Sequence, residues 1–177
     1  MAVKSANGDY LLFLNNDTEV ISPDAVEEML GCCMREDVGA VGAKLLYEDD
    51  TVQHAGVVIG FGGYAGHVNT GIGRDDYGYM VRARISCNYS AVTAACMMTK
   101  KSLFNRVGGF DEQFVIACND VDYCLKLREL DKWIVFNAFA EWHHYESKSR
   151  GYEDTKEKQK RFAGEVEKFQ KKWENYS

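Results

Sequence analysis

Apolar residues recur along the chain in patterns that predict alternating strands and helices. Residues 10–14 form a continuous apolar run, which is typical of a central strand buried on both faces. Ser22 and Pro23 stand where a helix N-cap and a first helical residue belong, and apolar residues at 25, 26, 29 and 30 follow at helical spacing. We therefore expect a strand and then a helix near the start of the chain.

Further apolar runs, bounded by glycine or charge, predict strands over residues 38–46, 56–61, 91–98 and 133–136. Helices are predicted over residues 101–107, from Asn119 to about residue 131, and in a charged C-terminal segment with apolar residues at 162, 166, 169 and 173. We interpret that last stripe as ordinary packing. No repeat or low-complexity linker divides the sequence, so residues 1–177 are predicted to form a single α/β domain.

Residues 62–88 differ from the rest because glycines alternate with tyrosines and arginines, including Tyr77, Arg74 and Arg82. Long irregular segments of this kind are often functional. We interpret this one as a loop over a site. The alternative is a surface loop whose glycines only permit tight turns.

Composition narrows the classes of function. The formal net charge of −6 offers no basic surface of the kind that nucleic acid selects, so no nucleic-acid partner is expected. Six cysteines without a CxxC pair indicate buried thiols in a reducing compartment. The sequence shows no leader and no long apolar span, which predicts a cytoplasmic location, with peripheral association of the parent protein at the inner face of the membrane.

Polar residues follow the first predicted strand directly, in the order Asn15-Asn16-Asp17. Ligands bind at strand ends in open α/β sheets, and Asp17 could hold a divalent cation there. The alternative is a plain turn, because Asn and Asp are common turn formers.

A second polar cluster, Asn119-Asp120-Val121-Asp122, lies at the start of a predicted helix. Capping alone could explain it, since Asn is a good N-cap and carboxylates in the first turn complement the helix dipole. A rigid helix start can also hold a carboxylate where it accepts a proton from an incoming hydroxyl.

The third cluster is the pair His143-His144. Such a pair can be an edge or core feature, but an imidazole, a carboxylate and diphosphate oxygens together also form a suitable shell for Mn²⁺ or Mg²⁺. His54 and His67 are interpreted as isolated structural or loop residues.

Taken in order, these clusters resemble glycosyltransferase family 2, particularly its rhamnosyltransferase-like branch. The strand ending at Asp17 resembles that family's DxD motif, with Asn15 in place of the first Asp. Gln53-His54-Ala55-Gly56, the strand with Thr93 and the sequence Gly-Gly-Phe-Asp-Glu at 108–112 resemble its middle region.

The remaining two matches lie later in the chain. Asp120 matches the Asp of the family's ED motif, with Asn119 where many members have Glu. The tail resembles the segment that carries a late metal-binding His, and aligning on Ser149-Arg150-Gly151 favours His144 over His143.

The resemblance implies a GT-A-type mixed sheet flanked by helices, and inverting transfer from a nucleotide-diphospho-sugar donor to a saccharide or glycolipid acceptor, in cell-surface polysaccharide synthesis. It implies a dTDP-rhamnose-like donor first and UDP-sugars second. The implied roles are the catalytic base for Asp120, donor contacts for Asn15, Asn16 and Asp17, Mg²⁺ or Mn²⁺ binding for Asp17 and His144, and acceptor binding for Asp122, Thr93, Asp111 and Arg82.

In this family, contacts to the base and ribose come largely from strands before the DxD motif, and Asn15 lies near the start of this sequence. We therefore expect the metal- and acceptor-side portion of such an enzyme, inactive alone and able to dimerise through the edge of residues 10–14. Asp17 and His144 should approach each other beside a hexose-sized cleft.

Two alternatives come from other classes. The first is a non-catalytic carbohydrate-binding or scaffolding module within a larger synthase. The second is a metal-dependent nucleotidyltransferase or phosphohydrolase using Asp17, Asp120 and Asp122, which would cleave a diphosphate without a sugar acceptor.

Overall fold

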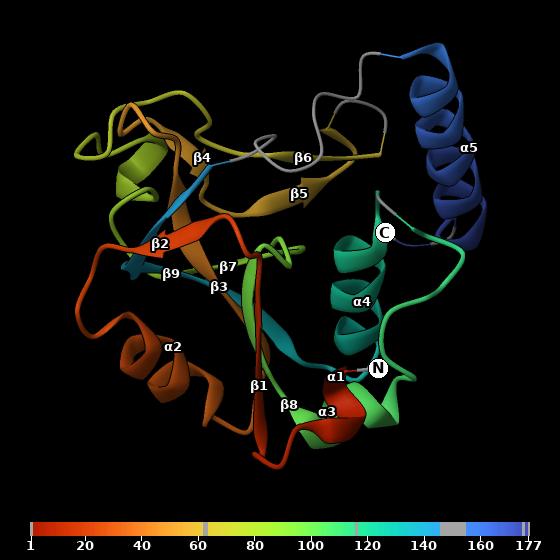
Figure 1. The fold of residues 1–177 in the computed structure, drawn as a ribbon, viewed down its shortest axis with the longest axis horizontal. Coiled ribbons are helices and arrows are strands. Elements are labelled where there is room, and N and C mark those ends of the chain that lie inside the picture. The colour runs from red at the N-terminus through yellow and green to blue at the C-terminus, as the bar shows by residue number, and fades with distance from the viewer. Residues whose placement is uncertain (1, 62–63, 116, 146–154, 175, 177) are drawn as a thin grey trace.

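The computed structural model describes residues 2–61, 64–115, 117–145, 155–174 and 176. Helices flank a seven-stranded mixed sheet whose path runs β1-β8-β3-β9-β2, while β4 pairs with β3 and β7 pairs with β9 (Figure 1). A separate hairpin consists of β5 and β6. Within the described ranges, no helix is long and apolar enough to cross a membrane.

The strands are β1 (Tyr10–Leu14), β2 (Thr18–Val20), β3 (Val38–Leu46), β4 (Val52–His54), β5 (Val57–Ile59), β6 (Ala65–His67), β7 (Cys87–Tyr89), β8 (Cys96–Lys100) and β9 (Trp133–His144). The helices are α1 (Ala2–Ser5), α2 (Ala25–Cys33), α3 (Lys101–Arg106), α4 (Asn119–Arg128), α5 (Lys156–Lys172) and the short 3-10 helix η2 (Tyr79–Val81).

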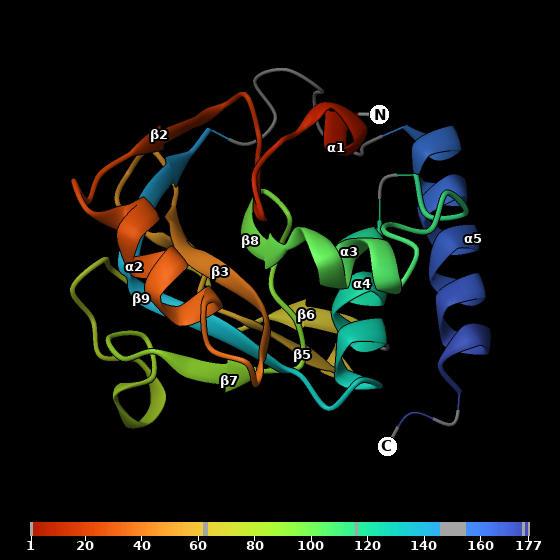
Figure 2. The ribbon, with the colours of Figure 1, turned by 90° about the horizontal axis from the view of Figure 1, so that it is seen from below.

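The centre of the sheet is the parallel pair β3 and β9. Every residue of β3 is buried, including Lys44, and the apolar residues that make up the rest of the strand predict such burial. Helix α2 packs on this pair through Ala25, Met29 and Cys33, and α4 packs on it from the other face (Figures 1 and 2). The layered α/β architecture predicted from the sequence is confirmed.

Strand β1 lies at the end of the sheet path, so its predicted central position is wrong. Among the described residues it pairs only with β8, and its burial is partial, with Leu14 45% exposed. Five consecutive apolar residues do not reveal which strands flank them, because neighbours are set by the topology of the whole sheet.

Two predicted strands have different bounds in the structure. The strand predicted over 91–98 begins only at Cys96, and residues 91–95 before it form no long strand. The strand predicted over 133–136 continues to His144 as β9, because its second half pairs with β3 and with β2. Both differences matter for the site, since Thr93 and His144 lie in these stretches.

The glycine-rich segment is more ordered than predicted, because it contains β6, η2 and the start of β7. At the other end of the chain, α5 buries Phe169 against Phe114 and Tyr64, which confirms the interpretation of its apolar stripe as packing. The segment Ser149-Arg150-Gly151, used above to favour His144, lies outside the described residues.

Candidate functional site

Asp17 and His144 lie together although they are far apart in the sequence. Strand β2 pairs antiparallel with β9 and aligns Thr18 with His144, so the residue before β2 meets the end of β9. Asp17 Oδ1 lies 3.3 Å from His144 Nε2, and the Asp17 carbonyl accepts a hydrogen bond from the Tyr145 amide. The expected approach of Asp17 and His144 is confirmed.

The His144 ring is held in one orientation by two side chains. Its Nδ1 lies 2.7 Å from Gln53 Oε1, an acceptor, so Nδ1 carries the proton. Nε2 is then unprotonated and can accept a hydrogen bond. This agrees with the Asn15 side-chain amide, which donates to it over 3.1 Å. In metal-binding histidines, a hydrogen bond to the ring nitrogen that does not bind the metal orients the imidazole in this way.

These residues fit a divalent cation. Two ligand atoms at roughly 2.1 Å from one ion and at right angles are about 3 Å apart, close to the 3.3 Å between Asp17 Oδ1 and His144 Nε2. No group of three or more His, Cys, Asp or Glu side chains suited to a metal occurs in the part of the chain that the structure describes. Among the described residues, Asp17 and His144 are therefore the pair that could contribute ligands.

Asp120 reaches the same region through residues 93–95. Its Oδ2 accepts a hydrogen bond from the Ala94 amide over 3.1 Å. The backbone carbonyl of the next residue, Ala95, accepts a hydrogen bond from the backbone N–H of Asn15. The short stretch that leads into β8 thus joins the start of α4 to the end of β1.

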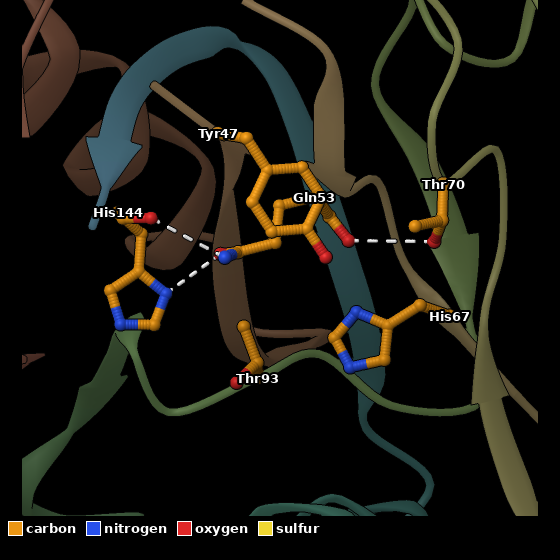
Figure 3. A pocket seen from close by; sticks show the side chains of 6 residues that line it. All are labelled: Tyr47, Gln53, His67, Thr70, Thr93 and His144. Atoms are coloured by element: carbon orange, nitrogen blue, oxygen red, sulfur yellow. Dashed lines mark hydrogen bonds between the residues drawn. The ribbon is translucent and has the colours of Figure 1, made fainter. Parts of the chain in front are cut away.

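A pocket of about 320 Å³ opens beside these groups, within the usual range for small-ligand sites. Figure 3 shows the rings of His144 and His67 on opposite sides of it, with Thr93 between them. Its described lining residues are Tyr47, Gln53, His67, Thr70, Thr93 and His144. Thr93, expected to bind acceptor, is therefore in this pocket, next to the Ala94 amide that binds Asp120.

Asp122 does not face this pocket, so its expected acceptor contact is wrong. Its side chain is fully buried, and Oδ1 accepts from Trp173 Nε1 over 2.9 Å and lies 2.6 Å from Lys172 Nζ. Lys126 Nζ lies 3.1 Å from the other oxygen. Asp122 ties α4 to the C-terminal helix, which also removes it from a metal-dependent phosphohydrolase site.

Asp111 is likewise engaged elsewhere. It forms an ion pair with Lys172 at 2.8 Å and accepts from the Gln113 amide in a turn. The hydrogen bond from Lys172 is the main reason that the pKa of Asp111 lies below its ordinary value. In this structure its carboxylate fastens α5, and Asp111 is not among the described residues that line the pocket.

The arginines of the glycine-rich segment do not line the pocket. Arg82 is exposed, and Arg74 makes a 2.7 Å ion pair with Glu141, which also lies 3.3 Å from the buried Lys44. Burial lowers the pKa of Lys44, and Glu141 opposes that shift. Arg82, an expected acceptor contact, is thus not among the described residues that line the pocket, whereas His67 and Thr70 of the same segment are.

One further pair of histidines had no signal in the sequence. His54 is fully buried, and its Nδ1 lies 3.1 Å from Nδ1 of His67. The interpretation of these residues as isolated is wrong, because β4 and β6 bring them together.

Asn16, expected to contact donor, is exposed at the turn after β1.

No protein-family model matches the sequence. The chain is 45% identical over 176 residues to the uncharacterized protein y4gI of Sinorhizobium fredii, and 41% identical over 158 residues to the O-antigen biosynthesis protein RfbC of Myxococcus xanthus. These matches cover 99% and 84% of this chain but 19% and 12% of the relatives. The chain thus spans less than a fifth of either relative.

Two solved structures share the arrangement of helices and strands. GalNAc-T7, solved with UDP, GalNAc and Mn²⁺, has a TM-score of 0.67 at 10% identity, over 94% of this chain and 33% of that chain. The mannosyltransferase PcManGT from Pyrobaculum calidifontis, in complex with GDP-Man and Mn²⁺, has a TM-score of 0.56 at 15% identity, over 94% and 41%. The chain therefore has the mixed-sheet fold of GT-A glycosyltransferases.

Proposed function

We propose that this chain forms the metal- and acceptor-side part of an inverting glycosyltransferase that moves a sugar from a nucleotide-diphospho-sugar to a saccharide or glycolipid hydroxyl. The observation that carries the proposal is the convergence of Asp17, His144 and Asp120 beside one pocket of a GT-A fold. These residues come from three separate elements, so a common capping or turn role does not account for all of them.

The Asp17 and His144 side chains would hold Mg²⁺ or Mn²⁺. When bound, such an ion neutralises the charge that develops on a departing diphosphate. Gln53 keeps the His144 proton on Nδ1, which leaves Nε2 available as a ligand. Asn15 donates to the same atom, so it would turn aside or bind a ligand oxygen when the ion is present.

Asp120 would act as the base. The Ala94 amide holds one carboxylate oxygen, and the rigid start of α4 holds the side chain as a whole. A carboxylate placed there can accept the proton of an acceptor hydroxyl as that oxygen bonds to the anomeric carbon and the nucleoside diphosphate leaves from the opposite face. Such a single displacement inverts the anomeric configuration.

The comparisons support this class without identifying the sugar. One relative carries a name from O-antigen biosynthesis, and both structural neighbours are sugar transferases bound to nucleotides or nucleotide-sugars with Mn²⁺. We propose a role in cell-surface polysaccharide synthesis, and membership of family 2 in its rhamnosyltransferase-like branch. A dTDP-rhamnose-like donor is the first candidate and UDP-sugars are the second.

The test is a donor screen on the longest natural protein that contains this sequence. UDP-, GDP- and dTDP-sugars are incubated with Mn²⁺ or Mg²⁺ and a panel of saccharide acceptors, and products are identified by mass spectrometry and NMR. We expect transfer with inverted configuration and loss of transfer with a chelator. Retained configuration would reject the single displacement, and diphosphate cleavage that ignores every acceptor would favour a phosphohydrolase.

A further inference from the structure

The pocket beside Asp17 and Asp120 has a lining suited to an uncharged, polyhydroxylated ligand. Its six described lining residues offer an amide, two aliphatic hydroxyls, a phenol and two imidazoles, and none of them is Lys, Arg, Asp or Glu. Phosphate groups select cationic side chains or clustered backbone amides, whereas sugar hydroxyls need donors and acceptors in equal measure. The lining therefore favours the sugar part of a substrate over its phosphates.

One wall of this pocket is the ring of His67, and the contact behind that ring is unusual. His67 Nδ1 lies 3.1 Å from Nδ1 of His54, with the two rings nearly perpendicular at 78°. His54 is fully buried beside Phe136, and burial, with smaller contributions from His67 and His144, lowers its pKa well below the ordinary value. A neutral imidazole has one N–H, so only one of the two facing nitrogens donates.

The environment of His54 Nε2 indicates which of the two facing Nδ1 atoms carries the proton. Its Nε2 is buried and has no hydrogen-bond partner among the residues that the structure describes. A buried N–H without a partner is rarer and more costly than a buried lone pair, so the proton of His54 belongs on Nδ1. His54 then donates to His67 Nδ1, and His67 carries its own proton on Nε2, the nitrogen left for a ligand.

We propose that His67 recognises a saccharide hydroxyl through its Nε2–H, and that His54 is a positioning residue that fixes this tautomer. The inference rests on the proposed function, because a sugar-transfer site explains why a neutral pocket lies between a cation site and a base. It goes further by naming a specificity residue on the wall opposite His144. The sugar could belong to the donor or to the acceptor, since both present hydroxyl groups.

The first test reads the two tautomers and the ligand class directly on the 177-residue chain. The sequence has four histidines, so long-range ¹H–¹⁵N spectra can assign every imidazole. We expect His54 protonated at Nδ1 and His67 at Nε2. The probes are methyl glycosides of glucose, galactose, mannose and rhamnose, then UDP-glucose and dTDP-rhamnose with Mg²⁺, then UDP and inorganic diphosphate with Mg²⁺.

A saturable shift of the His67 signals with a methyl glycoside would support an acceptor sugar, and a shift only with a nucleotide-sugar would support a donor sugar. A His67 response to UDP or diphosphate equal to that with the sugars would overturn the inference. So would the absence of any His67 response to all of these probes, or the opposite tautomer at His67.

Matched variants separate recognition from folding. His67→Phe keeps a ring but removes the donor and should weaken saccharide binding by about three- to tenfold, the usual effect of one hydrogen bond. His54→Phe should weaken saccharide binding to a similar extent, because nothing then donates to His67 Nδ1 and the proton of His67 is no longer fixed on Nε2. His54→Asn should bind saccharide more tightly than His54→Phe, because its amide can donate to His67 Nδ1. His143→Gln, which changes a histidine outside the pocket paired with Asp50, is the control.

Unchanged binding in His67→Phe, with the fold intact, would reject the inference alone. Saccharide binding that depends on His67, in a parent protein that transfers nothing from any donor, would instead reject the proposed transfer. The two failures therefore give different results.

Discussion

Two aspartates in the first turn of α4 show how environment separates the roles of identical side chains. Asp120 is half-buried and receives the Ala94 amide from the stretch that leads into β8. Asp122 is fully buried between Lys172, Lys126 and the Trp173 indole. The first can meet a substrate, and the second is enclosed by its own fold.

Substitution of these two residues should therefore have opposite consequences. Asp120→Asn keeps the shape but removes the base, so transfer by the parent protein should fall by about a hundredfold to ten-thousandfold with little loss of stability. Asp122→Asn removes the buried charge that pairs with the partly exposed Lys126 and Lys172, and should lower the free energy of unfolding by about 1–3 kcal/mol. Steady-state kinetics and urea unfolding measure both effects, and near-normal turnover of Asp120→Asn would exclude it as the base.

If Asp17 and His144 hold a cation as proposed, the Gln53 side chain should contribute to its binding. It holds both the ring Nδ1 and the carbonyl of His144. Gln53→Leu should free the ring and weaken Mn²⁺ binding by about ten- to a hundredfold, as is usual for residues that orient a ligand. Mn²⁺-induced paramagnetic broadening measures this, and His143→Gln is the control. Equal affinities in the wild type and Gln53→Leu would show that orientation of His144 by Gln53 does not contribute to Mn²⁺ binding.

At the scale of elements, the sequence predicted what depends on local burial and missed what depends on distant pairing. A nine-residue stretch that is apolar except for Lys44 was enough for β3, since a central parallel strand is buried on both faces. The second half of β9 was missed because Asn137, Glu141 and His143 interrupt its apolar pattern, and its pairing with β2 and β3 is long-range.

The residues of the candidate site likewise separate into those that could be predicted from the sequence and those that depend on distant contacts. The positions of Asp17 and His144 followed from the resemblance to a family, not from any periodicity. The contact between His54 and His67 had no local signal, because it depends on how β4 and the β5–β6 hairpin fold back. Likewise, the burial of Asp122 depends on α5, whose docking partner cannot be read from its own amphipathic stripe.

Gly56 at the turn between β4 and β5 is a test of this local geometry. Its φ is +108°, and a Cβ there would lie 2.3 Å from the Tyr89 ring. Gly56→Ala should therefore destabilise the fold by about 2–4 kcal/mol through strain and overlap. Gly31→Ala is the matched control, because no atom lies within 4 Å and the site is in a helix, so it should add about 0.5–1 kcal/mol. Urea unfolding of both proteins measures the difference.

At the scale of the whole molecule, α5 connects the C-terminal segment to the part of the chain that carries Asp120, the proposed base. Lys172 pairs with Asp111 and Asp122, which flank the start of α4 on either side in the sequence. Glu165 accepts a hydrogen bond from the Ala117 amide, three residues before Asp120. The segment that carries Asp120 is therefore held from one side by α5 and from the other by the Ala94 amide.

The buried His54 makes the stability of the whole fold depend on pH. Burial is the main reason that its folded-state pKa lies well below 6.5, whereas the unfolded chain takes up the proton near 6.5. Below that pH the unfolded state binds more protons, so the free energy of unfolding should fall as the pH falls, by at most about 1.4 kcal/mol per pH unit from this group. Above pH 6.5 the contribution is complete, and the decline ends once the folded-state pKa has been passed.

Urea unfolding between pH 8 and 5 measures that slope, compared with His54→Asn, which cannot titrate. The groups nearest His54 include His67, His144 and Phe136, so the variant removes one titrating group from a cluster that contains three histidines. We expect a shallower pH dependence in His54→Asn than in the wild type. Parallel curves for the wild type and His54→Asn would mean that His54 binds its proton equally in the folded and unfolded states. That result would reject the lowered folded-state pKa that we attribute to its full burial against Phe136 and the imidazole of His67.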